Sequence, residues 1–161
     1  MKNENYRKII ISFVIVLFIF FLDRITKILI LNITDESEKV DIYLNSFLNL
    51  YLVWNRGIGF GLLSFNEEYL YNSITALIAL INLAIIYLIF TEKEPKTYFL
   101  LAILGGSLGN LFDRVYYNAV PDFIDLNYKE FHWFIFNVAD IFITLGIICL
   151  IFTEIINYKK N

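Results

Sequence analysis

The chain has 161 residues, of which 58% are apolar and 18% aromatic, and its formal net charge is −3 at pH 7. Soluble domains contain about 45 to 50% apolar residues, so this composition, with a mean hydropathy of +0.63, favours a single compact membrane domain, residues 1–161. The acidic balance argues against a nucleic-acid partner. One cysteine, Cys149, excludes an internal disulfide, and with one histidine, His132, it excludes an ordinary closed zinc site. We therefore expect neither metal nor cofactor.

Residues 9–31 form the first predicted membrane span, since a span needs about 20 mostly apolar residues. The apolar run is interrupted by Ser12 and continues beyond Asp23, Arg24 and Lys27. A cleaved signal peptide is the alternative interpretation. No small-x-small cleavage site follows the run, which favours an uncleaved helix.

The segment 32–73 is expected to form an extracytoplasmic insertion. Residues 46–54 are rich in Leu, Phe, Tyr and Val, which predicts a strand. Glycines interrupt the pattern after Asn55. A short amphipathic helix is expected near 65–72.

Three more apolar runs predict spans at about 74–90, 97–115 and 133–153. The expected fold is an all-α membrane protein with four transmembrane helices, a small extracytoplasmic β-sheet and a short amphipathic helix. Basic residues accumulate on the cytoplasmic side of membrane proteins. Both termini are therefore predicted to be cytoplasmic, because seven of the 13 basic residues would share that side: Lys2, Arg7, Lys8, Lys93, Lys96, Lys159 and Lys160.

Two motifs lie near the predicted outer membrane surface. Asp23 and Lys27 are four residues apart, so they share a helical face and can neutralise each other. The run from Asn55 to Gly61 contains three glycines, including Gly57, which either leave backbone donors open to a ligand or simply form a turn.

The run Gly105-Gly106-Ser107-Leu108-Gly109 contains the Gly-x-Ser-x-Gly pattern of serine hydrolases. It lies within a helical apolar run, and a serine peptidase would also need His132 to reach Ser107. The spacing of Gly105 and Gly109 is more typical of two helices in close approach.

Asn110, Asp113 and Arg114 share one face at the outer end of the third span, where a structural ion pair is one interpretation. Asp122 follows in a loop and is flanked by apolar residues, which is unusual for a solvated acid. The residue pattern alone does not decide between Asp113 and Asp122 as a functional carboxylate.

Asn137 and Asp140 are three residues apart, with Asp140 expected about two turns inside the fourth span. An acid within a span is a functional candidate because an unpaired charge is costly in lipid. The topology brings Asp122 and Asp140 to the same outer end. Two neighbouring carboxylates cannot both ionise easily, so they share a proton and can act as acid and base on a peptide bond.

Together these motifs resemble the lipoprotein signal peptidase (signal peptidase II) family of bacterial membrane aspartic peptidases. The resemblance covers nearly the whole chain through four motifs in order: Asp23–Lys27, Asn55–Gly61, Gly109–Arg114 with Val120–Phe123, and Phe136–Asp140. Gly59 replaces the more usual Ala of the second motif, a small change in volume.

The resemblance implies that Asp122 and Asp140 are the catalytic dyad. It also implies structural support from Lys27 and Asp113, and roles in shaping the site and holding the substrate backbone for Asp23, Asn55, Gly57, Asn110, Arg114 and Asn137. The implied reaction removes the signal peptide of a prolipoprotein by hydrolysing the bond before its diacylglyceryl-modified Cys, near the outer leaflet of the bacterial cytoplasmic membrane. The implied partners are these substrates, membrane lipid and globomycin-type inhibitors.

Two other functions fit buried acids in spans. A proton or ion pathway would distribute acids at several depths, whereas Asp23, Arg114, Asp122 and Asp140 are expected to gather on one side. A structural assembly subunit would use the same residues to fasten helices, and replacing Asp122 would then impair folding rather than turnover.

Overall fold

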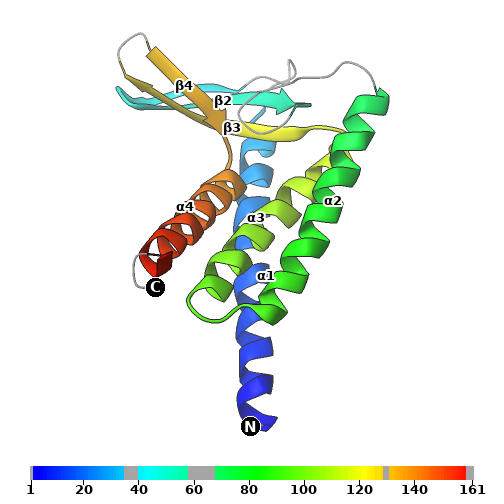
Figure 1. Cartoon of the computed structure of the whole chain (residues 1–161). Coiled ribbons are helices and arrows are strands. Elements are labelled where there is room, and N and C mark those ends of the chain that lie inside the picture. The colour runs from blue at the N-terminus through cyan, green and yellow to red at the C-terminus, as the bar shows by residue number, and fades with distance from the viewer. Residues whose placement is uncertain (1, 35–39, 58–67, 129–130, 159–161) are drawn as a thin grey trace.

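The computed structural model describes residues 2–34, 40–57, 68–128 and 131–158. Figure 1 shows a bundle of helices with a sheet lying across one end. The helices are α1 (Lys2–Asn32), α2 (Glu68–Thr91), α3 (Lys96–Tyr117) and α4 (Val138–Tyr158). The strands are β1 (Asp41–Asn45), β2 (Leu48–Asn55), β3 (Val120–Tyr128) and β4 (Phe131–Phe136).

Three helices in the described ranges are long and apolar enough to cross a membrane: Tyr6–Asn32, Glu68–Thr91 and Val138–Tyr158. Their outward surfaces are apolar, since Phe13, Leu83 and Phe152 are each more than 60% exposed. A helix that is apolar on all sides is suited to lipid rather than water. The protein is therefore a mostly helical membrane protein, as the composition predicts.

The third helix, α3, lies between the other helices and contacts all three. Glycines allow this close packing. A Cβ at Gly105 would lie 2.9 Å from Ile19 Cβ of α1, and one at Gly106 would lie 2.5 Å from the carbonyl oxygen of Ala139 in α4. The predicted close approach at Gly105 and Gly109 is confirmed, and α1 is the partner helix.

The four strands form one antiparallel sheet in the order β1-β2-β3-β4. The sheet packs on the C-terminal end of α1 through Ile30, Val40, Leu52 and Phe123. This apolar cluster fixes the sheet above the helix ends, so polar side chains of β2 and β3 can meet those of the helices.

Two sequence predictions about this region are wrong. The sheet does not come from residues 32–73 alone, because β3 and β4 follow α3, and residues 133–136 belong to β4 instead of starting the fourth span. Most residues from Phe131 to Phe152 are apolar, both in the strand β4 and in the helix α4. Hydrophobicity therefore does not mark where the strand ends and the helix begins. Asp140 consequently lies in the first turn of α4, not two turns inside it.

The described part of the predicted amphipathic helix near 65–72 is not a separate element. Residues 68–72 form the start of α2, while residues 65–67 lie outside the described ranges. Gly59 and Gly61 also lie outside them.

The close contact between Gly106 and α4 predicts how a larger side chain at this position changes the melting temperature. Replacing Gly106 with Val should lower the melting temperature in detergent by several degrees, because the new side chain collides with the backbone of α4 and overpacking costs about 1 to 3 kcal/mol. Ala84→Val on the exposed surface of α2 is the matched control and should leave the melting temperature nearly unchanged. Equal melting temperatures for the two variants would contradict this packing.

Candidate active site

Buried polar side chains gather where the helices meet the sheet. Burying such groups is costly unless they are paired or hydrogen-bonded, so their gathering marks either a site or a compensated network. The set comes from α1, α3, β2, β3 and the residue before α4, and it contains Asp23, Arg24, Lys27, Asn55, Asp113, Arg114, Asp122 and Asn137.

Asp122 lies on β3 and is 2% exposed. Asn55 Nδ2 donates to its Oδ2 at 2.8 Å, and Asn137 Nδ2 donates to its Oδ1 at 2.6 Å. The β2–β3 ladder explains the first contact, because it pairs Asn55 with Val120, two residues from Asp122. Burial and, next, the charge of Asp140 raise the pKa of Asp122 from 3.8 to about 7, against the effect of the two amide hydrogen bonds.

Asp140 lies at the start of α4, where it forms a reciprocal cap with Asn137. The backbone N–H of Asp140 donates to Asn137 Oδ1 at 3.1 Å, and the backbone N–H of Asn137 donates to Asp140 Oδ2 at 3.2 Å. This is a capping box with Asn and Asp in place of Ser and Glu. The positive end of the helix dipole favours a carboxylate at this position. Asn110 Nδ2 donates to the other oxygen, Oδ1, at 2.8 Å.

The amides of Asn55, Asn110 and Asn137 are all oriented in the same way. In each, the NH₂ group donates to Asp122 or Asp140, while a fixed donor holds the carbonyl oxygen. That donor is the N–H two residues further on for Asn55 (2.8 Å), the N–H of Asp140 for Asn137 (3.1 Å), and Lys27 Nζ for Asn110 (2.9 Å). An amide has donors at one end and an acceptor at the other, so these contacts prevent it from turning over.

Lys27 is fully buried, and its ammonium group has three acceptors. It donates to Asp23 Oδ2 at 2.8 Å, to Asp113 Oδ2 at 2.6 Å and to Asn110 Oδ1. The predicted pairing of Asp23 with Lys27 is confirmed. Arg24 also donates to Asp113, so two cations and two carboxylates balance one another.

Asp23 extends this network to α4. Its Oδ1 accepts the backbone N–H of Ala139 at 3.0 Å, one of the N–H groups that a helix start leaves without a partner inside the helix. A Cβ at Gly109 would lie 2.6 Å from Asp23 Oδ2, so glycine is needed for this contact between α1 and α3. Asp23 therefore connects α1 to the start of α4.

Arg114 takes a different position from the one its neighbours suggest. Asp113 pairs with Arg24 and Lys27, and no ion pair of Arg114 is found in the described part of the chain. Its Nη2 instead donates to the carbonyl oxygen of Gly57, whose N–H is held by Asn55. The predicted site residues thus form one continuous hydrogen-bonded network: Asp23, Lys27, Asn55, Gly57, Asn110, Asp113, Arg114, Asp122, Asn137 and Asp140.

The sequence did not identify Tyr71, which is 1% exposed and donates from its hydroxyl to the carbonyl oxygen of Arg114 at 3.1 Å. No motif surrounds this residue, which is one of 11 tyrosines. Only the packing of α2 on α3 reveals it.

Ser107 lies in the middle of α3, not on the strand-to-helix turn that exposes the nucleophile of serine hydrolases. The alternative interpretation of its Gly-x-Ser-x-Gly motif as a nucleophile turn is therefore wrong. The backbone of His132 pairs with Asn127 in the sheet.

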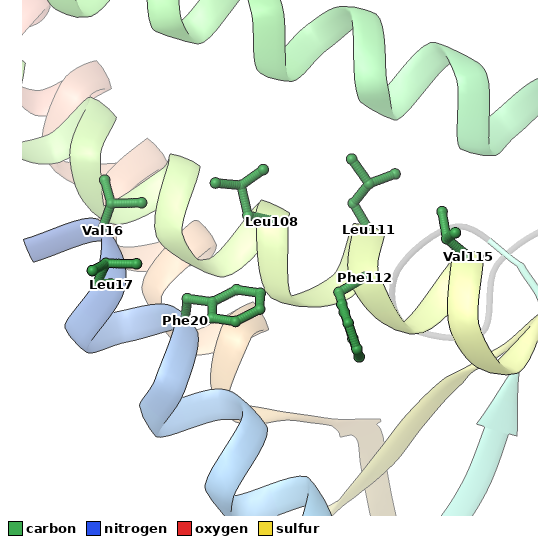
Figure 2. Close-up of a pocket in the computed structure, with 7 residues that line it drawn as sticks. All are labelled: Val16, Leu17, Phe20, Leu108, Leu111, Phe112 and Val115. Carbon is green, nitrogen blue, oxygen red and sulfur yellow. The ribbon is translucent and has the colours of Figure 1, made fainter. Parts of the chain in front are cut away.

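A separate groove of about 450 Å³ lies between α1 and α3 and has an apolar lining (Figure 2). Its walls are Val16, Leu17, Phe20, Leu108, Leu111, Phe112 and Val115. The lining offers no group for acid, base or nucleophilic chemistry, so the groove is not the reaction centre.

Comparison with known proteins shows the family to which the chain belongs. The family model described as Signal peptidase (SPase) II, Peptidase_A8, matches residues 15–156. The lipoprotein signal peptidase of Pelagibacter ubique (strain HTCC1062) is 50% identical over 162 residues, covering 100% of this chain and 98% of that protein. The lipoprotein signal peptidase of Anaplasma marginale (strain Florida) is 33% identical over 153 residues, covering 94% of this chain and 88% of the relative.

Two solved structures of bacterial membrane enzymes, obtained by the in meso method, share the fold. The one at 2.3 Å resolution has a TM-score of 0.79 and 27% identity, covering 93% of this chain and 90% of the other. The one at 1.9 Å has a TM-score of 0.69 and 28% identity, covering 89% and 91%. The chain belongs to the lipoprotein signal peptidase family, the signal peptidase II aspartic peptidases that remove signal peptides from prolipoproteins.

Proposed function

We propose that Asp122 and Asp140 are the catalytic dyad, and that the bond hydrolysed is the one before the diacylglyceryl-modified Cys of the prolipoprotein. The observation that carries this proposal is the bridge formed by Asn137. Its side chain donates to Asp122, and its backbone N–H donates to Asp140, so one residue holds both carboxylates.

The surroundings of the two acids suggest different roles. Asp140 lies at a helix start and accepts hydrogen bonds from the backbone N–H of Asn137 and from the side-chain amide of Asn110, which favours the ionised form. It is assigned as the base that takes a proton from water. Asp122 is buried and has a pKa of about 7, so it carries the shared proton and polarises the peptide carbonyl.

The reaction balances without another reactant. The water oxygen bonds to the carbonyl carbon, its proton moves to Asp140, and Asp122 protonates the carbonyl oxygen. The resulting diol collapses as the C–N bond breaks. Asp140 then gives its proton to the leaving nitrogen, while Asp122 regains a proton from the diol, so both carboxyl groups return to their starting forms.

The proposed topology places α3 in the membrane as a fourth span, the sheet at the outer leaflet and both termini in the cytoplasm. Basic residues lie at the end of the bundle away from the sheet, where Lys8 Nζ is 3.7 Å from Glu94 and Lys96 pairs with Glu154. This arrangement follows the positive-inside rule. A substrate whose signal peptide is a membrane helix can then reach the dyad laterally from lipid.

The dyad is tested by cleavage of a diacylglyceryl-modified prolipoprotein in detergent. Asp122→Asn and Asp140→Asn should remain folded and lose about 10²- to 10⁴-fold in kcat, because each removes an acid or a base. Ser107→Ala and added EDTA should leave cleavage unchanged, and a globomycin-type inhibitor should block it. Full activity of either Asp variant contradicts the assignment, and absence of cleavage by the wild type contradicts the bond chosen.

The pKa of Asp122 predicts a pH dependence with a definite sign. A group whose pKa is higher in the folded than in the unfolded protein contributes stability at low pH, and this stability is lost as pH rises through the folded pKa. The wild type should therefore lose stability relative to Asp122→Asn between about pH 4 and pH 7, and lose kcat/KM above about pH 7. Melting temperatures and rates measured across pH test this. Parallel melting curves for the two proteins would contradict it.

The orientation of Asn110 can be tested by removing the donor that holds its carbonyl oxygen. Lys27→Met removes the donor that holds Asn110 Oδ1, so kcat should fall about tenfold or more, since Asn110 no longer reliably donates to Asp140. In an Asn110→Ala background the same substitution should have a much smaller effect. Arg24→Met is the matched control, because Arg24 shares Asp113 but has no hydrogen bond to Asn110 among the described residues. Equal losses for Lys27→Met in both backgrounds would show that Lys27 acts only through stability.

A further inference from the structure

Tyr71 connects α2 to the last turn of α3. α3 ends at Tyr117, so the carbonyl of Arg114 is among the last four, which have no partner within the helix. The Tyr71 hydroxyl donates to this carbonyl oxygen at 3.1 Å. The buried tyrosine thereby fixes the backbone from which the Arg114 side chain extends.

The ring of Tyr71 also contacts two guanidinium groups. Its centroid lies 5.5 Å from Arg114 Cζ and 5.6 Å from Arg56 Cζ, both within the range of a cation–π interaction. Arg56 immediately precedes Gly57, whose carbonyl oxygen accepts a hydrogen bond from Arg114 Nη2. Tyr71 therefore holds both the backbone and the side chain of Arg114, together with the segment after β2.

Arg114 retains unused hydrogen-bonding capacity. The residue is 4% exposed, and its Nε and Nη1 have no hydrogen-bond partner in the described part of the chain. Leaving buried charged donors without acceptors is costly. A substrate backbone carbonyl, an acceptor without charge, would satisfy them at a point connected to Asp122 through Gly57 and Asn55.

We propose that Tyr71 is a positioning residue for the peptidase reaction, holding Arg114 so that its unused donors bind a backbone carbonyl of the substrate. This inference rests on the proposed function, in which Arg114 holds substrate. Tyr71 itself does not contact the reacting atoms. Its effect is therefore on substrate affinity rather than on the chemical step.

The test separates KM from kcat, with prolipoprotein as substrate. Tyr71→Leu removes both the ring and the hydroxyl and should raise KM about tenfold, with kcat changed less than about twofold. Tyr71→Phe keeps the ring and the volume, so it should stay folded and raise KM about two- to threefold. Tyr69→Leu, at a residue 78% exposed on the same helix, is the matched control and should behave like the wild type.

A double-mutant cycle distinguishes positioning from general support of the fold. In an Arg114→Gln background, Tyr71→Leu should raise KM no further. An unchanged KM in both Tyr71 variants overturns the inference, as does an equal rise in KM with and without Arg114. If instead Asp122→Asn retains full cleavage, the proposed dyad fails, and this result is independent of Tyr71.

Discussion

The structure depends on the fixed orientation of three asparagine amides around two carboxylates. Asn55, Asn110 and Asn137 each direct an NH₂ group at Asp122 or Asp140, and each has its carbonyl oxygen held by another donor. A flipped amide would place two acceptors face to face, a loss in a buried site where unsatisfied groups are costly. The five side chains are therefore arranged before substrate arrives, which is how a preorganised site favours a reaction.

The donors that orient the amides come from different levels of structure. Two are backbone N–H groups, one at the start of α4 and one just after β2, so they are determined by the fold. The third is the side chain of Lys27, whose burial is possible because Asp23 and Asp113 neutralise it. The charged network is thus more than a clamp between α1 and α3, because it also determines which end of Asn110 faces Asp140.

The sequence predicted the parts of this site that follow local spacing. The pairing of Asp23 with Lys27 follows from helical periodicity, and the close approach at Gly105 and Gly109 follows from small residues four apart. The resemblance to a family implied all ten residues of the network, although it did not predict which of them contact one another. The composition predicted a membrane protein, because a chain with 58% apolar residues has more apolar side chains than soluble domains usually contain.

Other features depend on contacts that no local pattern encodes. The sequence predicts that the apolar run before Asn137 is helical, because β4 and α4 are both rich in apolar residues, and it therefore does not reveal the cap that holds Asp140. A structural ion pair between Arg114 and its neighbouring carboxylates is one interpretation of the sequence, but in the structure Asp113 pairs with Arg24 from another helix. Tyr71 is brought to Arg114 only by the packing of α2 on α3. In each case the deciding partner is distant in the sequence.

In the proposed mechanism the dyad shares one proton near neutral pH, and Asp122 carries it. Infrared difference titration tests this directly, because a protonated carboxyl group has a carbonyl stretch that an ionised one lacks. In the wild type, such a band should disappear as pH rises through about 7. It should be absent from Asp122→Asn, and in Asp140→Asn it should persist but disappear at lower pH, because the neighbouring charge is gone. A band that survives in Asp122→Asn and is lost in Asp140→Asn would contradict the account.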